Sequence, residues 1–103
     1  MKLMTKEIEK KIPKLYSQDG KGYDAIVHVK YFDPLGSSAW FGTEYDKEQR
    51  LFFGWACLNG NIEDAELGYF SLDQIENTRI ERDMYFAPCS LKKAIKDKYG
   101  IDV

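Results

Sequence analysis

The sequence predicts an α+β fold in a single domain spanning residues 1–103. We expect a four- to five-stranded, mainly antiparallel sheet, with short helices at the N-terminus, after the fourth strand and at the C-terminus. Three observations predict this fold. Runs rich in β-branched and aromatic residues are separated by turn residues. The connections between these runs are too short for the crossovers that parallel strands need. Three other segments begin with the Ser or Thr that typically caps a helix.

The predicted strands span residues 25–32, 39–45, 50–58 and 66–70, followed by an extended edge segment at 80–88. Every second side chain of the first strand is apolar, and period-two alternation indicates a half-buried strand. The expected core face of that strand comprises Ala25, Val27, Val29 and Tyr31. The third strand is apolar on both faces, so we expect it to lie inside the sheet, covered on each side.

Local capping signals mark the three helices. Thr5 precedes "KEIEKKI", and Pro13 ends that pattern. Ser71 and Gln74 have the spacing of a capping box, directly after the fourth strand. Ser90 opens "LKKAIKDKY", which a glycine follows. The side chains expected to face inward from the last two helices are Leu72, Ile75, Leu91, Ala94 and Ile95.

Charge is unevenly distributed along the chain. The formal net charge is −2, but residues 33–83 carry eleven acidic against four basic side chains, whereas both flanking segments are basic. Such a split can steer association with an oppositely charged partner, and it is also typical of an ordinary solvated surface. The chain has no apolar run long enough to cross a membrane and no export signal, so we expect a cytoplasmic protein.

The stretch "FDPLGSSAWFGTEYD", residues 32–46, combines acidic and hydroxyl side chains and therefore could be an active-site loop. Pro34 and Gly36, however, lie between two apolar runs, and Asp-Pro and Gly-Ser sequences are typical of turns. We expect a hairpin in which Asp33 accepts main-chain N–H bonds, with Ser37 and Ser38 lining the turn.

The sequence gives little sign of catalysis. His28 is the one histidine and lies within the first predicted strand, where a packing role is expected. Cys57 and Cys89 lack ligand spacing, so free buried thiols are expected. The acidic group Glu63, Asp64 and Glu66 could bind a cation or transfer protons, but a solvated loop is the simpler interpretation. No cofactor or metal ion is expected.

Two kinds of binding remain. The aromatic side chains that could stack on single-stranded nucleic acid are Tyr31, Trp40, Phe41, Phe52 and Trp55. They fall in the acidic part of the chain, which disfavours binding of phosphate by the sheet. An acidic surface instead fits a basic, nucleic-acid-handling protein. The candidate partner-binding residues are Trp40, Glu44, Tyr45, Asp46, Glu63, Asp64 and Glu66, of which we expect Trp40 and Tyr45 to be exposed anchors beside Glu44.

Four segments carry a resemblance: "LMTKEIEKKIPKLY", "VKYFDPLGSSAW", "FFGWACLNGNIEDAELGYFSLDQIE" and "IERDMYFAP". Together, with "ELGYFSL" and "IERD-x-YF-x-P" as the specific motifs, they resemble a bacterial family catalogued as a domain of unknown function. Members of that family are carried on plasmids and conjugative elements, and no catalytic residues are recognised in it.

The resemblance implies a non-enzymatic anti-defence protein of a mobile genetic element, and most concretely an anti-CRISPR inhibitor of a type II RNA-guided nuclease. It would bind the nuclease or its guide complex, or interfere with guide loading. One alternative is a plasmid accessory protein that binds another transfer protein. Another is a weak nucleic-acid-binding module that uses the lysines of the terminal helices.

Overall fold

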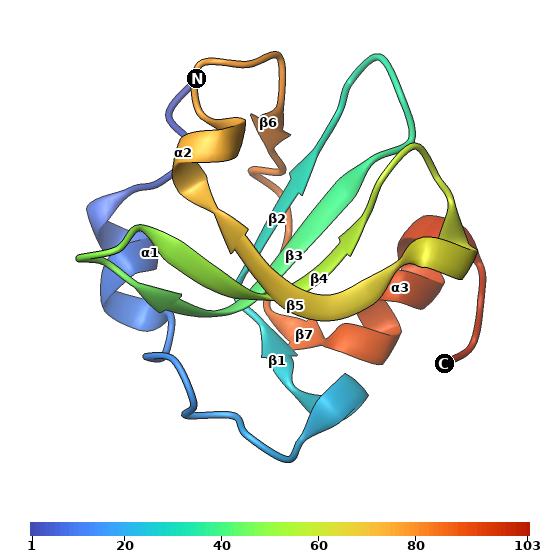
Figure 1. Cartoon of the computed structure of the whole chain (residues 1–103), viewed down its shortest axis with the longest axis horizontal. Helices are drawn as coiled ribbons and strands as arrows, with labels where there is room; N and C mark the ends of the chain where they lie inside the picture. Colours follow the sequence, from blue (N-terminus) through green and yellow to red (C-terminus); the bar gives the residue numbers. More distant parts are fainter.

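A five-stranded antiparallel sheet runs through the middle of the protein, as a computed structural model of residues 1–103 shows (Figure 1). Its strand order is β5-β4-β3-β2-β6. The strands of this sheet are β2 (Val29–Phe32), β3 (Ala39–Asp46), β4 (Leu51–Cys57), β5 (Glu66–Ser71) and β6 (Glu81–Arg82). β2 to β5 form a meander in which each strand pairs with the next in sequence. The predicted α+β class and antiparallel pairing are confirmed, with β4 inside the sheet and β5 at its edge.

A second, two-stranded sheet joins the two halves of the chain. β1 (Ile26–Val27) pairs with β7 (Cys89–Ser90) in antiparallel register. The prediction of one continuous strand at 25–32 is therefore wrong, because the chain changes sheet at His28. The prediction that alternate residues there are buried is confirmed, since Val27 and Tyr31 have no exposed surface. They do not share one core, however: Val27 packs on one side of the sheet and Tyr31 on the other.

A β-bulge at Thr43 explains how strand β3 contributes large side chains to the cores on both faces of the sheet. The β3–β4 register pairs Gly42 with Gly54 and then Glu44 with Phe53, so Thr43 is an extra residue in β3. An extra residue reverses the side-chain alternation beyond it. Phe41 consequently packs in the core beneath the last helix, whereas Tyr45 packs in the opposite core.

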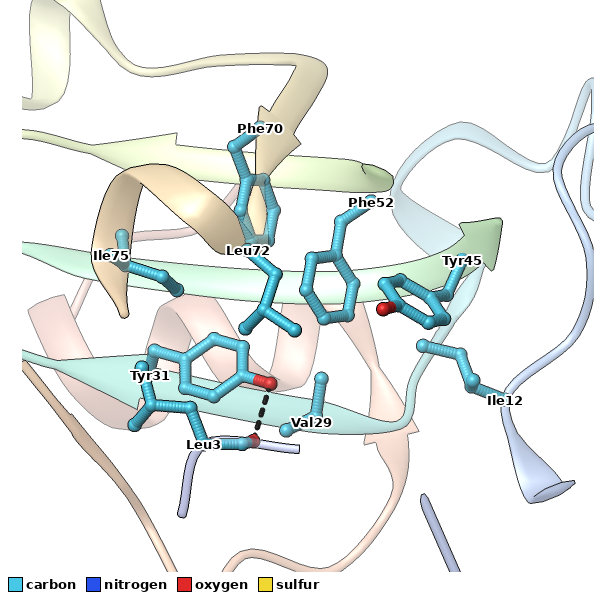
Figure 2. Packing of buried hydrophobic residues seen from close by; sticks show 9 residues of the cluster. All are labelled: Leu3, Ile12, Val29, Tyr31, Tyr45, Phe52, Phe70, Leu72 and Ile75. Carbon is cyan, nitrogen blue, oxygen red and sulfur yellow. Dashed lines mark hydrogen bonds between the residues drawn. The ribbon is translucent and has the colours of Figure 1, made fainter. Parts of the chain in front are cut away.

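The first core lies between the sheet and the short helices α1 (Lys6–Lys11) and α2 (Leu72–Ile75) (Figure 2). Its centre is Phe52, whose ring stacks on that of Phe70. The centroid of the Phe52 ring lies 4.9 Å from the Phe70 centroid and 4.5 Å from the Tyr45 centroid. The buried Tyr31 hydroxyl donates to the Leu3 carbonyl at 2.7 Å, which fixes the N-terminal segment over this core. Burial raises the pKa of Tyr31 well above its usual value, so the hydroxyl remains a donor.

The second core lies beneath the C-terminal helix α3 (Leu91–Tyr99), which covers the other face of the sheet (Figure 1). The predicted inward residues Leu91, Ala94 and Ile95 are buried there against Phe41 and Trp55. Two short 3₁₀ turns complete the elements, η1 (Gly22–Asp24) and η2 (Ile62–Asp64).

The predicted helix caps are confirmed. The Thr5 hydroxyl accepts from the Ile8 N–H at 3.1 Å, and the Ser90 hydroxyl accepts from the Lys93 N–H at 3.3 Å. Ser71 and Gln74 form the reciprocal capping box of α2. No helix of the structure has the length and the apolar character needed to cross a bilayer.

Gly54 provides a test of the close strand approach beside the bulge. A Cβ at this position would overlap the Phe41 carbonyl oxygen and lie 2.9 Å from the carbonyl carbon, so the backbone would have to move. Gly68 on β5 pairs with Gly54, and a Cβ at Gly68 would meet nothing within 4 Å. We expect Gly54→Ala to lower the free energy of unfolding by about 3 kcal/mol or more, and Gly68→Ala to change it by less than about 1 kcal/mol.

Urea denaturation followed by tryptophan fluorescence measures both variants. Equal loss of stability in the two would contradict the close approach at Gly54.

Candidate functional site

Two of the predicted partner-binding residues are not on the surface. Glu44 is 3% exposed and Tyr45 is 5% exposed, so the prediction that Tyr45 is an exposed anchor beside Glu44 is wrong. Trp40 is half-buried and packs against the first core. Asp46 is half-buried at the end of β3, where it accepts from the Glu48 N–H at 3.0 Å and the Gln49 side chain at 2.6 Å. Both faces of β3 are covered at this point, because Tyr45 packs in the first core and Glu44 lies against the main chain of Tyr16 and Gln18.

Glu44 holds the loop between α1 and η1. Its carboxylate accepts the Tyr16 N–H at 2.8 Å and the Gln18 N–H at 2.6 Å. The buried Gln18 side chain in turn donates to the Ile26 and Thr43 carbonyls and accepts the Ile26 N–H at 2.7 Å. This network connects the loop, β1 and the bulge, so the role of Glu44 is structural.

The other predicted acidic residues are on the surface. Glu63 and Asp64 lie in η2 and Glu66 begins β5; all three are exposed, and none forms an ion pair. The Asn61 side chain donates to Asp64 at 2.7 Å. A shallow hollow of about 450 Å³ lies beside them. Its lining comprises Ala56, Leu58, Asn59, Asn61, Asp64, Glu66, Gly68 and Tyr69.

Exposed apolar side chains lie beside these acids, and they were not predicted from the sequence. Leu58 is 57% exposed, and Tyr69 on β5 is 53% exposed. Tyr16 is exposed too, and interaction with its side chain raises the pKa of Tyr69, as does partial desolvation. The exposure of Tyr69 could have been predicted from the alternation of side chains along β5, because Phe70 faces the core and its neighbour Tyr69 must face away from it.

The residues considered for catalysis do not line this hollow. His28 is half-buried where β1 meets β2, and burial lowers its pKa. Cys57 is buried and Cys89 is half-buried, where burial raises its pKa. Both thiols are free, as predicted. No three His, Cys, Asp or Glu side chains converge in an arrangement that could hold a metal ion.

The aromatic side chains considered for nucleic-acid stacking are packing residues. Phe41, Phe52 and Tyr31 are fully buried, and Trp55 is 2% exposed. Stacking of a base needs an accessible ring face, so these rings do not form a stacking platform.

The stretch that could have been an active-site loop is a hairpin turn between β2 and β3. The Asp33 carboxylate accepts the Leu35 N–H at 2.9 Å, which confirms its predicted capping role. It also accepts two hydrogen bonds from Arg79, at 2.9 and 2.8 Å. Ser38 is buried, and its hydroxyl accepts the Asn59 N–H at 2.8 Å.

Substitution tests the structural role of Glu44. Glu44→Ala leaves two main-chain N–H groups without their charged acceptor, so we expect the free energy of unfolding to fall by about 2 to 4 kcal/mol. Glu48 is exposed two residues beyond β3, and we expect Glu48→Ala to change stability by less than about 0.5 kcal/mol. Thermal unfolding of both variants compares them. A Glu44→Ala variant as stable as Glu48→Ala would contradict the proposed anchoring.

Acid titration tests the ion pair of the hairpin. The hydrogen bonds from Arg79 hold the pKa of Asp33 below its usual value of 3.8. A depressed carboxylate pKa contributes stability above the unfolded-state pKa, and this contribution is lost as the pH falls through the folded-state value. Between about pH 5 and pH 2, wild type should therefore lose more stability than Asp33→Asn.

Urea unfolding at several pH values gives this comparison. Asp19→Asn removes an exposed carboxylate that forms no ion pair, and the stability of this variant should depend on pH as that of wild type does. The same acid dependence in Asp33→Asn as in wild type would show that the pair does not contribute.

Comparison with known proteins identifies a family for this chain. A family model described as "Protein of unknown function (DUF2958)" matches residues 3–93, from the N-terminal segment into α3. A search of curated proteins finds no match, and a search of solved structures finds none. Because the family model covers most of the chain, the protein belongs to the DUF2958 family.

Proposed function

We propose that the protein is a non-enzymatic inhibitor that binds a basic, nucleic-acid-handling protein, and specifically an anti-CRISPR protein of a mobile genetic element that acts on a type II RNA-guided nuclease. The observation that carries the proposal is the exposed acidic group Glu63, Asp64 and Glu66, which has no basic neighbour in an ion pair. We call this group, with the exposed Leu58 and Tyr69, the β5 surface.

The chemistry of the β5 surface supports a protein partner. Interfaces commonly combine an aromatic or aliphatic anchor with a polar rim. Here Leu58 and Tyr69 provide apolar area, and the Asp64 and Glu66 carboxylates provide negative charge around the same hollow. A nucleic acid would be repelled by these carboxylates, whereas a protein site that normally binds phosphates would attract them.

A type II RNA-guided nuclease contains such a basic site. Its channel holds the guide–target heteroduplex through contacts to the backbone and is strongly positive. An acidic surface bound in that channel would compete with guide RNA or with target DNA. Inhibition then needs only binding, which agrees with a chain whose histidine is half-buried and whose Cys57 is buried.

A cleavage assay tests the proposal. The purified type II nuclease is mixed with guide and target DNA, and the protein is added either before or after guide loading. We expect less cleavage in its presence, and the effective order of addition identifies the blocked step. Absence of inhibition in both orders, with no nuclease co-purifying from cells, would instead favour a plasmid accessory protein that binds another transfer protein.

A charge variant connects inhibition to the β5 surface. In Glu63→Gln/Asp64→Asn/Glu66→Gln, we expect the inhibitory concentration to rise about tenfold, since each exposed ion pair contributes a factor of about two to five. The control Glu9→Gln/Glu48→Gln/Asp102→Asn removes the same charge from other exposed positions. Equal weakening by both variants would mean that only net charge matters, and the β5 surface would not be the contact site.

A further inference from the structure

The outer edge of β5 is open. The five-stranded sheet ends at β5, which pairs only with β4. Figure 1 shows β5 crossing the molecule between η2 and α2. Such an edge exposes a row of main-chain donors and acceptors to which another extended segment can bind.

The hydrogen-bond pattern identifies which groups are free. The Leu72 N–H donates to the Arg50 carbonyl at 2.9 Å, and this pair continues the β4–β5 register. Bonded and non-bonded pairs alternate along an antiparallel ladder. The N–H and C=O groups of Leu67 and Tyr69 therefore point away from β4. No main-chain group elsewhere in the protein bonds to these two residues.

β5 lacks the features that usually protect an edge. The strand "ELGYFS" contains no proline and no lysine, and its register with β4 has no bulge. The opposite edge strand β6 is only two residues long, whereas β5 has six. Gly68 leaves open space between the two outward-facing residues, because a Cβ there would meet nothing within 4 Å.

We propose that β5 binds an extended, basic segment of a partner protein as an additional strand of the sheet. This inference rests on the proposed function for the nature of the partner, and it specifies how that partner docks. The main-chain groups of Leu67 and Tyr69 pair with the incoming strand, and alternate side chains of that strand reach the flanking acids. These acids are Asp19, Glu63, Asp64 and Glu66, all exposed and without ion pairs.

The charge near the open edge favours a basic strand of a partner over the β5 strand of a second copy of the chain. The Tyr16 side chain is the main cause of the raised pKa of Tyr69, and the charge of Asp19 adds to it, which places Asp19 toward the Tyr69 end of the open edge. Glu66 begins the strand at the other end. A second β5 would bring the same carboxylates to the interface, where like charges repel. A lysine- or arginine-bearing strand would instead place opposite charges near both ends.

Amide hydrogen exchange with model peptides tests the proposal without a nuclease. The probes are a ten-residue peptide of alternating Lys and Thr and its counterpart of alternating Glu and Thr. With the lysine peptide in excess, exchange of the Leu67 and Tyr69 amides should slow at least tenfold, and the glutamate peptide should have no effect. Unchanged exchange with the lysine peptide would overturn the proposal. Protection that appears without peptide and grows with protein concentration would also overturn it, in favour of self-pairing.

A proline variant separates the main chain from the side chain. Tyr69→Pro removes an outward N–H, which an edge strand tolerates without losing its ladder, and Tyr69→Ala removes the same ring but keeps the donor. The lysine peptide should bind Tyr69→Ala and should bind Tyr69→Pro at least tenfold more weakly. Equal binding by the two variants would overturn the proposal. If Tyr69→Pro does not fold, the exchange measurement on the wild type decides alone.

The same variants in the cleavage assay keep the two proposals distinct. Peptide binding without nuclease inhibition would support the docking mode and reject the proposed function. The opposite result has two parts: the peptide leaves exchange of the Leu67 and Tyr69 amides unchanged, and Tyr69→Pro inhibits the nuclease as well as Tyr69→Ala does. That result would support the function and reject the docking mode.

Discussion

The single extra residue at Thr43 is the constraint on which the rest of the structure depends. It lets β3 contribute Phe41 to one core and Tyr45 to the other, so a sheet of five strands is covered on both faces. Buried polar groups fix the bulge. The Gln18 amide donates to the Thr43 carbonyl at 2.8 Å, and the Thr43 hydroxyl donates to the Phe53 carbonyl at 3.0 Å. A bulge left without these bonds would bury unpaired main-chain groups.

The helices and most strands could be predicted because their signals are local. A cap such as Ser71 with Gln74 acts within one turn, and the alternation of β4 and β5 is visible in neighbouring residues. The bulge could not be predicted, since nothing in "FGTEY" distinguishes a regular strand from one with an extra residue. The partners of Thr43 come from Gln18 and Phe53, distant in sequence. The predicted exposure of Tyr45 beside Glu44 was wrong because segments distant in sequence cover both faces of β3, with Tyr45 in the first core and Glu44 against the main chain of Tyr16 and Gln18.

The candidate site was predictable only in part, because sequence charge does not distinguish free from bound carboxylates. Within the acidic part of the chain, Asp33 and Glu44 are buried and accept main-chain N–H bonds. Asp73 and Glu76 both pair with Arg50, each at 2.6 Å. The acids at the start of β5 have no such partners. The charge that a partner could meet is therefore smaller than the composition suggests, and three of the free, exposed carboxylates lie together at the start of β5.

The pairing of β1 with β7 has a consequence for folding during synthesis. The hairpins from β2 to β5 connect residues close in sequence and can form as soon as they leave the ribosome. Ile26, by contrast, pairs with Ser90, so β1 must wait for more than sixty further residues before its partner exists. Until then the second core lacks the side chains of α3, and Phe41 and Trp55 stay uncovered. The nascent chain therefore exposes one aromatic face of its sheet until the last helix is made. Chaperone binding during synthesis would protect this face from aggregation.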